Sequence, residues 1–177
     1  RQIPAYAMTE EPLPGSTEAR KLIVSEALGY LDRLAAGSQR EDVKMELALG
    51  YKQVGRVQGD PQSANLGERG PALESFRKAL GILATLRDSP AMGATALFET
   101  SQVNRLVAQT LQVMGRTEEA RTASREALAT AEAALARDPD DAETRRLVAS
   151  GHFSMALSEP DRPTKLRHWL EAERGFE

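Results

Sequence analysis

The chain has no cysteine among its 177 residues. Disulfides, thiolate metal sites and cysteine nucleophiles are therefore excluded. No apolar run reaches the roughly 18 residues that a membrane-spanning helix needs, since Glu132 and Arg137 interrupt the alanine-rich run near Ala129. Basic residues are not in excess either, because 23 Lys and Arg stand against 26 Asp and Glu. This balance argues against a nucleic-acid partner, which would need a basic surplus to neutralise phosphates.

Aromatic residues make up only 5% of the chain, against 41% apolar residues overall. A core built mainly from alanine and leucine favours closely packed helices. The length is sufficient for one domain with a substantial core or for a short repeat array. Because the chain begins at Arg1 and not at Met, we expect it to be a soluble fragment of a longer protein.

Apolar residues recur at spacings of three and four, and no segment alternates with period two over a useful length. The sequence therefore predicts an all-α fold of about seven helices. In the first helix, the expected apolar positions are Ile23, Ala27, Tyr30, Leu31 and Leu34. The expected helices cover residues 16–37, 40–58, 71–87, 92–114, 117–137, 141–157 and 163–176.

Self-comparison shows an internal repeat. Lys78-Ala79-Leu80 recurs as Glu126-Ala127-Leu128, 48 residues further on, and an earlier copy lies at Glu26-Ala27-Leu28. Arg105-Leu106-Val107-Ala108 recurs 41 residues later, at 146–149. Similar segments at variable spacing are typical of an array of helix pairs.

The pattern of small residues within these segments resembles the tetratricopeptide repeat family, whose unit pairs two antiparallel helices. The first unit matches best, at Val54-Gly55, Gly67, Ala72, Phe76 and Ala79. The second unit offers Val107-Ala108, Leu111, Gly115, Ala120, Ser124 and Ala127, so serine stands where the second aromatic belongs. The third offers Val148-Ala149, Trp169 and Ala172. Phe76 and Trp169 would then be core residues.

The resemblance implies an α-α superhelix, a stack of antiparallel helix pairs. We expect an extended lead-in over residues 1–15 and an N-terminal capping helix over 16–37. The repeat array would cover 38–177, in units of about 40–89, 92–137 and 141–176.

A narrower resemblance rests on four segments, at 13–17, 30–35, 54–59 and 63–67. They are similar to the repeat region of certain bacterial membrane-anchored serine/threonine protein kinases, in which a kinase domain and one membrane span precede the repeats. The resemblance implies that this chain is the non-catalytic part of such a kinase, on the extracytoplasmic side of the membrane. Without that context, a cytoplasmic location is expected. The chain itself carries no phosphate loop, His-Arg-Asp or Asp-Phe-Gly motif.

The first helix of each unit would line the concave side of such an array. Polar residues expected there form a mildly basic groove for a peptide carboxylate or acidic side chains. The alternative is that these are ordinary solvated helix faces. The candidate groove residues are Lys52, Arg56, Arg105, Gln109, Gln112, Arg146 and Ser150.

The connection at residues 59–70 is long for a helix-helix loop, where about 2–8 residues is typical. Four of its polar residues are candidates for contact with a ligand or an ion: Asp60, Ser63, Asn65 and Glu68. The alternative, which we favour, is a hydrogen-bonded turn that packs Leu66 inward. Two histidines, His152 and His168, have no metal-binding pattern around them. We predict no metal, no cofactor and no catalytic residue.

The sequence thus predicts a protein-protein interaction module, with another protein or peptide as partner. It predicts no nucleic-acid partner and no membrane contact within this chain. The alternative is a structural repeat domain that self-associates as a homodimer through Trp169 and Phe176 at its end.

Overall fold

A computed structural model describes residues 16–37, 39–158 and 161–176. The expected lead-in over residues 1–15 lies outside this range. Seven helices lie within it, and none of the described residues is in a strand. The expected all-α fold is therefore confirmed. The helices are α1 (Ser16–Ala35), α2 (Glu41–Gly59), α3 (Arg69–Leu86), α4 (Gly93–Val113), α5 (Thr117–Arg137), α6 (Ala142–Ser158) and α7 (Arg162–Phe176).

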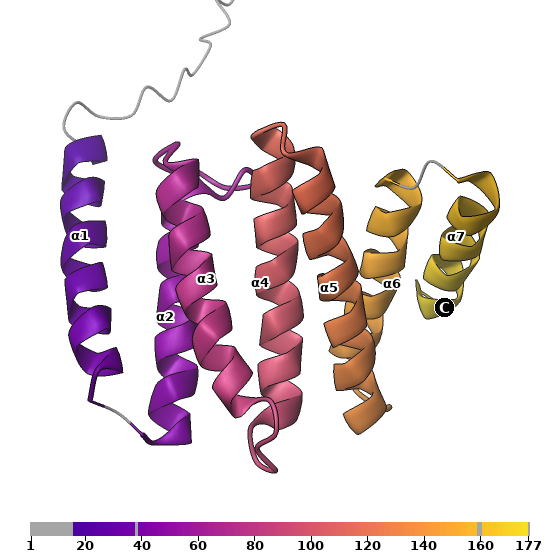
Figure 1. Ribbon diagram of the computed structural model, residues 1–177, viewed down its shortest axis with the longest axis horizontal. Coiled ribbons are helices and arrows are strands. Elements are labelled where there is room, and N and C mark those ends of the chain that lie inside the picture. Colours follow the sequence, from indigo (N-terminus) through magenta and orange to yellow (C-terminus); the bar gives the residue numbers. More distant parts are fainter. Residues whose placement is uncertain (1–15, 38, 159–160, 177) are drawn as a thin grey trace, which may run out of the picture.

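The helices stand side by side in chain order, from α1 at one end to α7 at the other (Figure 1). Packing is most extensive within the consecutive pairs α2–α3, α4–α5 and α6–α7. The pairs are joined through α3–α4 and α5–α6, and α2 also touches α4 directly. The molecule is thus a stack of helical hairpins, in which α2 and α4 lie on the same side.

Small residues set the distance between α2 and α3. A Cβ atom on Gly55 would lie 2.5 Å from Cε1 of Phe76, so the absence of a side chain lets the ring approach. Ala72, Phe76 and Ala79 are fully buried. Glycine and alanine at the crossing allow close helix approach, and the aromatic ring fills the space beside them.

Gly115 ends α4 as expected, and Gly67 lies in the connection before α3. Gly67 and Gly115 both have a φ of 75°, a left-handed conformation that glycine adopts without steric cost. Gly115 follows α4, and its amide donates to the carbonyl of Gln112, which closes the last turn. The third helix begins at Arg69, two residues before the expected Pro71.

The first helix presents only part of the expected face to the core, because Leu31 packs there whereas Ile23 and Tyr30 do not. Val24 is buried, whereas Ile23 and Tyr30 are 67% and 60% exposed. Leu28 and Leu31 pack against the core. Apolar residues occupy both flanks of α1, so their spacing alone did not decide which flank faces α2.

Trp169 is not the core residue that the resemblance implies. It is 40% exposed, and its ring meets that of Phe153 edge-on at 5.1 Å. The reason is its position in α7, which packs on α6 and has no later helix of the described chain beyond it. Among the described residues, no helix is both long and apolar enough to cross a membrane.

Candidate functional site

Two neighbouring pockets open on the side of the stack where α2 and α4 lie. The larger has a volume of about 470 Å³ and is lined mainly by residues of α4, α5 and α6. The smaller lies between α2 and α4. Arg105 of α4 and Gln62 of the connection between α2 and α3 line both pockets. These two residues therefore mark the boundary of a continuous groove.

The structure divides the predicted groove residues into three sets. Arg105, Gln109 and Gln112 line the larger pocket, one helical turn apart along α4. Lys52 and Arg56 join Arg105 in the smaller one. Arg146 and Ser150 do not belong to the lining of either pocket. The α6 residues that do are Leu147, Gly151 and Ser154.

Carboxylates neutralise two of the three cations that line the smaller pocket. Lys52 Nζ lies 2.5 Å from Glu99 Oε2, and both side chains are mostly buried. Arg56 Nε lies 3.1 Å from Asp60 Oδ2. The groove is consequently less basic at this end than its lysine and arginine content indicates.

Arg105 differs from these two cations. Its Nη2 donates to the amide oxygen of Gln102 at 3.1 Å, and no described carboxylate forms an ion pair with it. A guanidinium with one neutral partner keeps donors for an incoming carboxylate. Arg105 is thus the strongest candidate anion contact in the groove.

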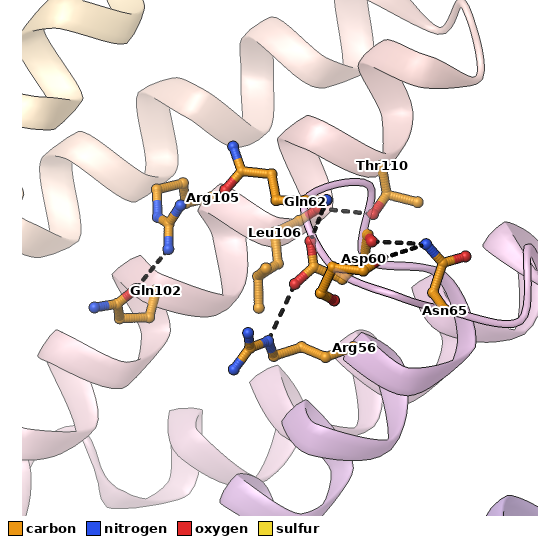
Figure 2. A network of polar contacts seen from close by, with 9 residues as sticks. Arg56, Asp60, Gln62, Asn65, Gln102, Arg105, Leu106 and Thr110 are labelled. Atoms are coloured by element: carbon orange, nitrogen blue, oxygen red, sulfur yellow. Dashed lines mark hydrogen bonds and ion pairs between the residues drawn. The ribbon is translucent and has the colours of Figure 1, made fainter. Parts of the chain in front are cut away.

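The connection between α2 and α3 is a hydrogen-bonded turn around Asp60 (Figure 2). Asp60 Oδ1 accepts from the Gln62 amide at 2.9 Å. Asn65 Nδ2 donates to the carbonyls of Asp60 and Ser63, both at 2.9 Å, and its Oδ1 accepts from the Gly67 amide at 2.7 Å. The polar groups of Asp60 and Asn65 therefore form hydrogen bonds within the turn, except for Asp60 Oδ2, which accepts from Arg56 of α2.

Backbone hydrogen bonds fasten the same turn to α2. The Leu66 amide donates to the backbone carbonyl of Val57 at 3.0 Å, and the Glu68 amide donates to that of Gln58 at 2.8 Å. Gln58 is itself buried and accepts from Ser75 Oγ at 2.7 Å. This anchoring fixes where Pro61 and Gln62 lie on the wall of the groove.

Asp60 remains ionised in this setting. Burial raises the pKa of its carboxyl group, but hydrogen bonds from the Gln62 amide and from Arg56 outweigh that effect. The pKa is therefore lowered below its ordinary value. A carboxylate held in this way positions a turn, as a Glu or Asp cap does at a helix end.

Sequence reasoning missed Arg121 of α5, which lines the larger pocket. Its Nη1 lies 3.3 Å from Glu118, whereas its buried Nε has no hydrogen-bond partner. The buried Oε1 of Gln109, another lining residue, also has none. Leaving a buried donor or acceptor unpaired costs on the order of 1–3 kcal/mol.

His152 and His168 meet between α6 and α7. Their Nδ1 atoms are 3.0 Å apart, and His152 Nε2 lies 3.6 Å from Glu132. No cluster of three or more His, Cys, Asp or Glu side chains suited to a metal ion occurs within the described part of the chain. The histidine contact joins the two helices of the last hairpin.

Comparison with known proteins adds little to this geometry. No protein-family model matches the chain, and no curated protein matches it. Among solved structures, it is similar to one described as "Crystal structure of MamA". The identity is 14%, with 92% of this chain and 94% of that chain covered, and the TM-score is 0.25. A TM-score this low carries no argument about fold or function.

Proposed function

We propose that this chain is a protein-binding helical repeat module of the tetratricopeptide type, without catalytic activity of its own. A segment of a partner protein would lie in the groove formed by α2, α4 and α6. Lys52, Arg56, Arg105, Gln109 and Gln112 would form its polar wall.

Packing in the first unit supports the choice of repeat type. Gly55, Ala72, Phe76 and Ala79, which carry the resemblance, meet at the α2–α3 crossing and are buried. They therefore serve as packing residues, as the repeat pattern requires. The direct contact of α2 with α4 supports an arrangement in which the first helices of successive units line one side.

The observation that carries the proposal is the position of Arg105. It stands where the two pockets meet, and no described carboxylate pairs with it. A concave site excludes some water, so a cation within it attracts a carboxylate more strongly than a fully exposed cation does. Lys52 and Arg56 contribute less, because Glu99 and Asp60 hold them.

A peptide-display selection on the immobilised chain tests this function. Selected peptides are expected to carry a carboxylate, and calorimetry should show about 10–100-fold weaker binding to Arg105→Glu, since a charged hydrogen bond is replaced by repulsion. Arg146→Glu is the matched control, because Arg146 lies outside both pockets. Its affinity should stay within about twofold of the wild type. Equal losses in both variants would refute a groove centred on Arg105.

The sequence resemblance further supports a position in a bacterial serine/threonine kinase, after the kinase domain and the membrane span of the same polypeptide. The reading frame that encodes the chain tests this context directly. A kinase domain followed by one apolar span upstream of Arg1 is expected. Any other upstream domain would remove the kinase proposal and leave the binding module untouched.

A second candidate function is self-association through the last helix. Leu166, Trp169 and Leu170 are 60%, 40% and 47% exposed, and together they form an apolar face on α7. Apolar surface of this kind marks an interaction site when it is contiguous. Light scattering after size exclusion tests it: a dimer that Trp169→Ser converts to a monomer supports self-association. A wild-type monomer at high concentration excludes it.

A further inference from the structure

The internal repeat relates α3 to α5 by 48 residues. Ala72, Phe76 and Ala79 of α3 correspond to Ala120, Ser124 and Ala127 of α5. The alanines behave alike, since all four are buried. The middle position differs, because a fully buried phenylalanine in one helix is a half-buried serine in the other.

The facing helices also correspond, but at a spacing of 53 residues, because the connection between α2 and α3 is longer than that between α4 and α5. Gly55 of α2, against which the Phe76 ring packs, corresponds to Ala108 of α4. Ala108 lines the larger pocket together with Ala120, Ser124 and Ala127. The hydroxyl of Ser124 does not fill the space, because it turns back to donate to the Ala120 carbonyl at 3.0 Å. The pocket thus occupies the place that an aromatic ring fills one unit earlier.

We propose that this pocket receives an aromatic side chain from a bound peptide, next to a carboxylate held by Arg105. The proposal rests on the function proposed above and names the chemistry that the groove recognises. A volume of about 470 Å³ lies within the range of roughly 300–1,000 Å³ that ligand pockets have. Small side chains form the floor, and Leu147 of α6 forms the opposite wall.

Two unpaired polar atoms give independent support. Gln109 Oε1 and Arg121 Nε belong to side chains that line the pocket, yet both atoms are covered and lack partners. A peptide group offers a donor and an acceptor, which are the two partners they need. Rotation of either side chain toward an occupant would satisfy polar groups that have no hydrogen-bond partner within the protein.

N-acetylphenylalanine combines the ring, the amide and the carboxylate in one small probe. In ¹⁵N-labelled protein it is expected to shift amide resonances of α4, α5 and α6 around the pocket, with a Kd on the order of 1 mM. N-acetylalanine lacks the ring and should bind at least about tenfold more weakly. N-acetylphenylalanine amide lacks the carboxylate and should also bind more weakly. N-acetylphenylalanyl-aspartyl amide carries a side-chain carboxylate and no C-terminal one. Comparing its Kd with that of N-acetylphenylalanine shows which of the two carboxylates the groove prefers.

The variant Ser124→Phe places the missing ring in the pocket. It should retain the helical circular dichroism of the wild type and lose the probe-induced shifts. Thr122→Phe, on the exposed side of the same helix, should keep them. If Ser124→Phe does not fold, Ser124→Val serves as a partial filler and should weaken binding at least threefold.

Two results would overturn the proposal: no saturable shift with N-acetylphenylalanine in the wild-type protein, or binding unchanged in a folded Ser124→Phe variant. Failure of the aromatic pocket can be distinguished from failure of the proposed binding function. A groove that selects acidic peptides without aromatic residues, in a manner sensitive to Arg105→Glu, would keep the binding module and remove the aromatic pocket. Probe binding that ignores Arg105→Glu would remove the assigned carboxylate contact.

Discussion

The α carbon of Gly55 lies against the ring of Phe76, so close that a Cβ atom on residue 55 would stand 2.5 Å from Cε1 of the ring. Phe76 is completely buried between α2, α3 and the neighbouring core. It therefore has little room to move away. This contact fixes how α3 crosses α2, and α2 carries one wall of the smaller pocket.

Gly55→Ala is expected to destabilise the protein by about 1–3 kcal/mol, the usual cost of overpacking a tight core. Gly81→Ala is the matched control in α3, because a Cβ there meets nothing within 4 Å. It should stabilise the helix by about 0.5–1 kcal/mol through its lower backbone entropy in the unfolded chain. Urea denaturation followed by circular dichroism measures both. Equal free energies of unfolding for the two variants would contradict the contact.

Asp60 is expected to make stability depend on pH. Its pKa is lowered in the folded protein, so its contribution is complete above the ordinary Asp pKa of about 3.9 and is lost as the pH falls through the lowered value. Asp60→Asn should cost about 1–3 kcal/mol at pH 7, since it removes the partner of Arg56. The difference from the wild type should shrink toward pH 3.

Denaturation of both proteins at pH 7 and pH 3 measures this effect. Asp140→Asn, an exposed carboxyl before α6, controls for the general loss of one negative charge. If Asp60→Asn lowers the free energy of unfolding by the same amount at both pH values, an ionised, stabilising Asp60 is contradicted. An equal loss of stability in Asp140→Asn would show that the effect is not specific to Asp60.

Tyr51 holds α1 to the stack. Its buried hydroxyl donates to Asp32 at 2.5 Å, and Lys78 of α3 lies 2.6 Å from the same carboxylate oxygen. Hydrogen bonds from Lys78 and from Tyr51 lower the pKa of Asp32, while burial and Asp32 raise that of Tyr51. This link matters because α1 lies at one end of the stack and packs mainly on α2.

Tyr51→Phe is expected to remove about 1 kcal/mol of this attachment. Amide hydrogen exchange in α1 should then become several-fold faster, with α4 unchanged, because the ends of a helical stack open locally. Tyr30→Phe removes a hydroxyl from a side chain that is 60% exposed and should change nothing. Equal acceleration in α4 would mean global destabilisation instead of local release.

Sequence periodicity predicted the helices well, because each is long enough for several apolar repeats. It predicted the inward face of α1 only in part. Ile23 and Val24 are adjacent and both apolar, so only packing on α2 decides which is buried. It also missed Arg121 and the pocket, because the space depends on the separation of α4, α5 and α6. The one sequence signal was the serine at position 124, where the preceding unit has Phe76.

The last hairpin is expected to unfold before the rest. Its large apolar residues Leu166, Trp169 and Leu170 are substantially exposed, and the buried apolar residues in the described part of α6 and α7 are three alanines and Met155. Stability in a stacked array is the sum of each unit and its neighbour contacts, so a terminal hairpin with little buried area is weakest.

Because Trp169 is the single tryptophan, its fluorescence reports on this hairpin. Its edge-on contact with Phe153 makes the signal sensitive to separation of α6 from α7. The urea midpoint by fluorescence should fall below that by circular dichroism by about 0.5 M. Coincident midpoints would show that all three hairpins unfold as one cooperative unit.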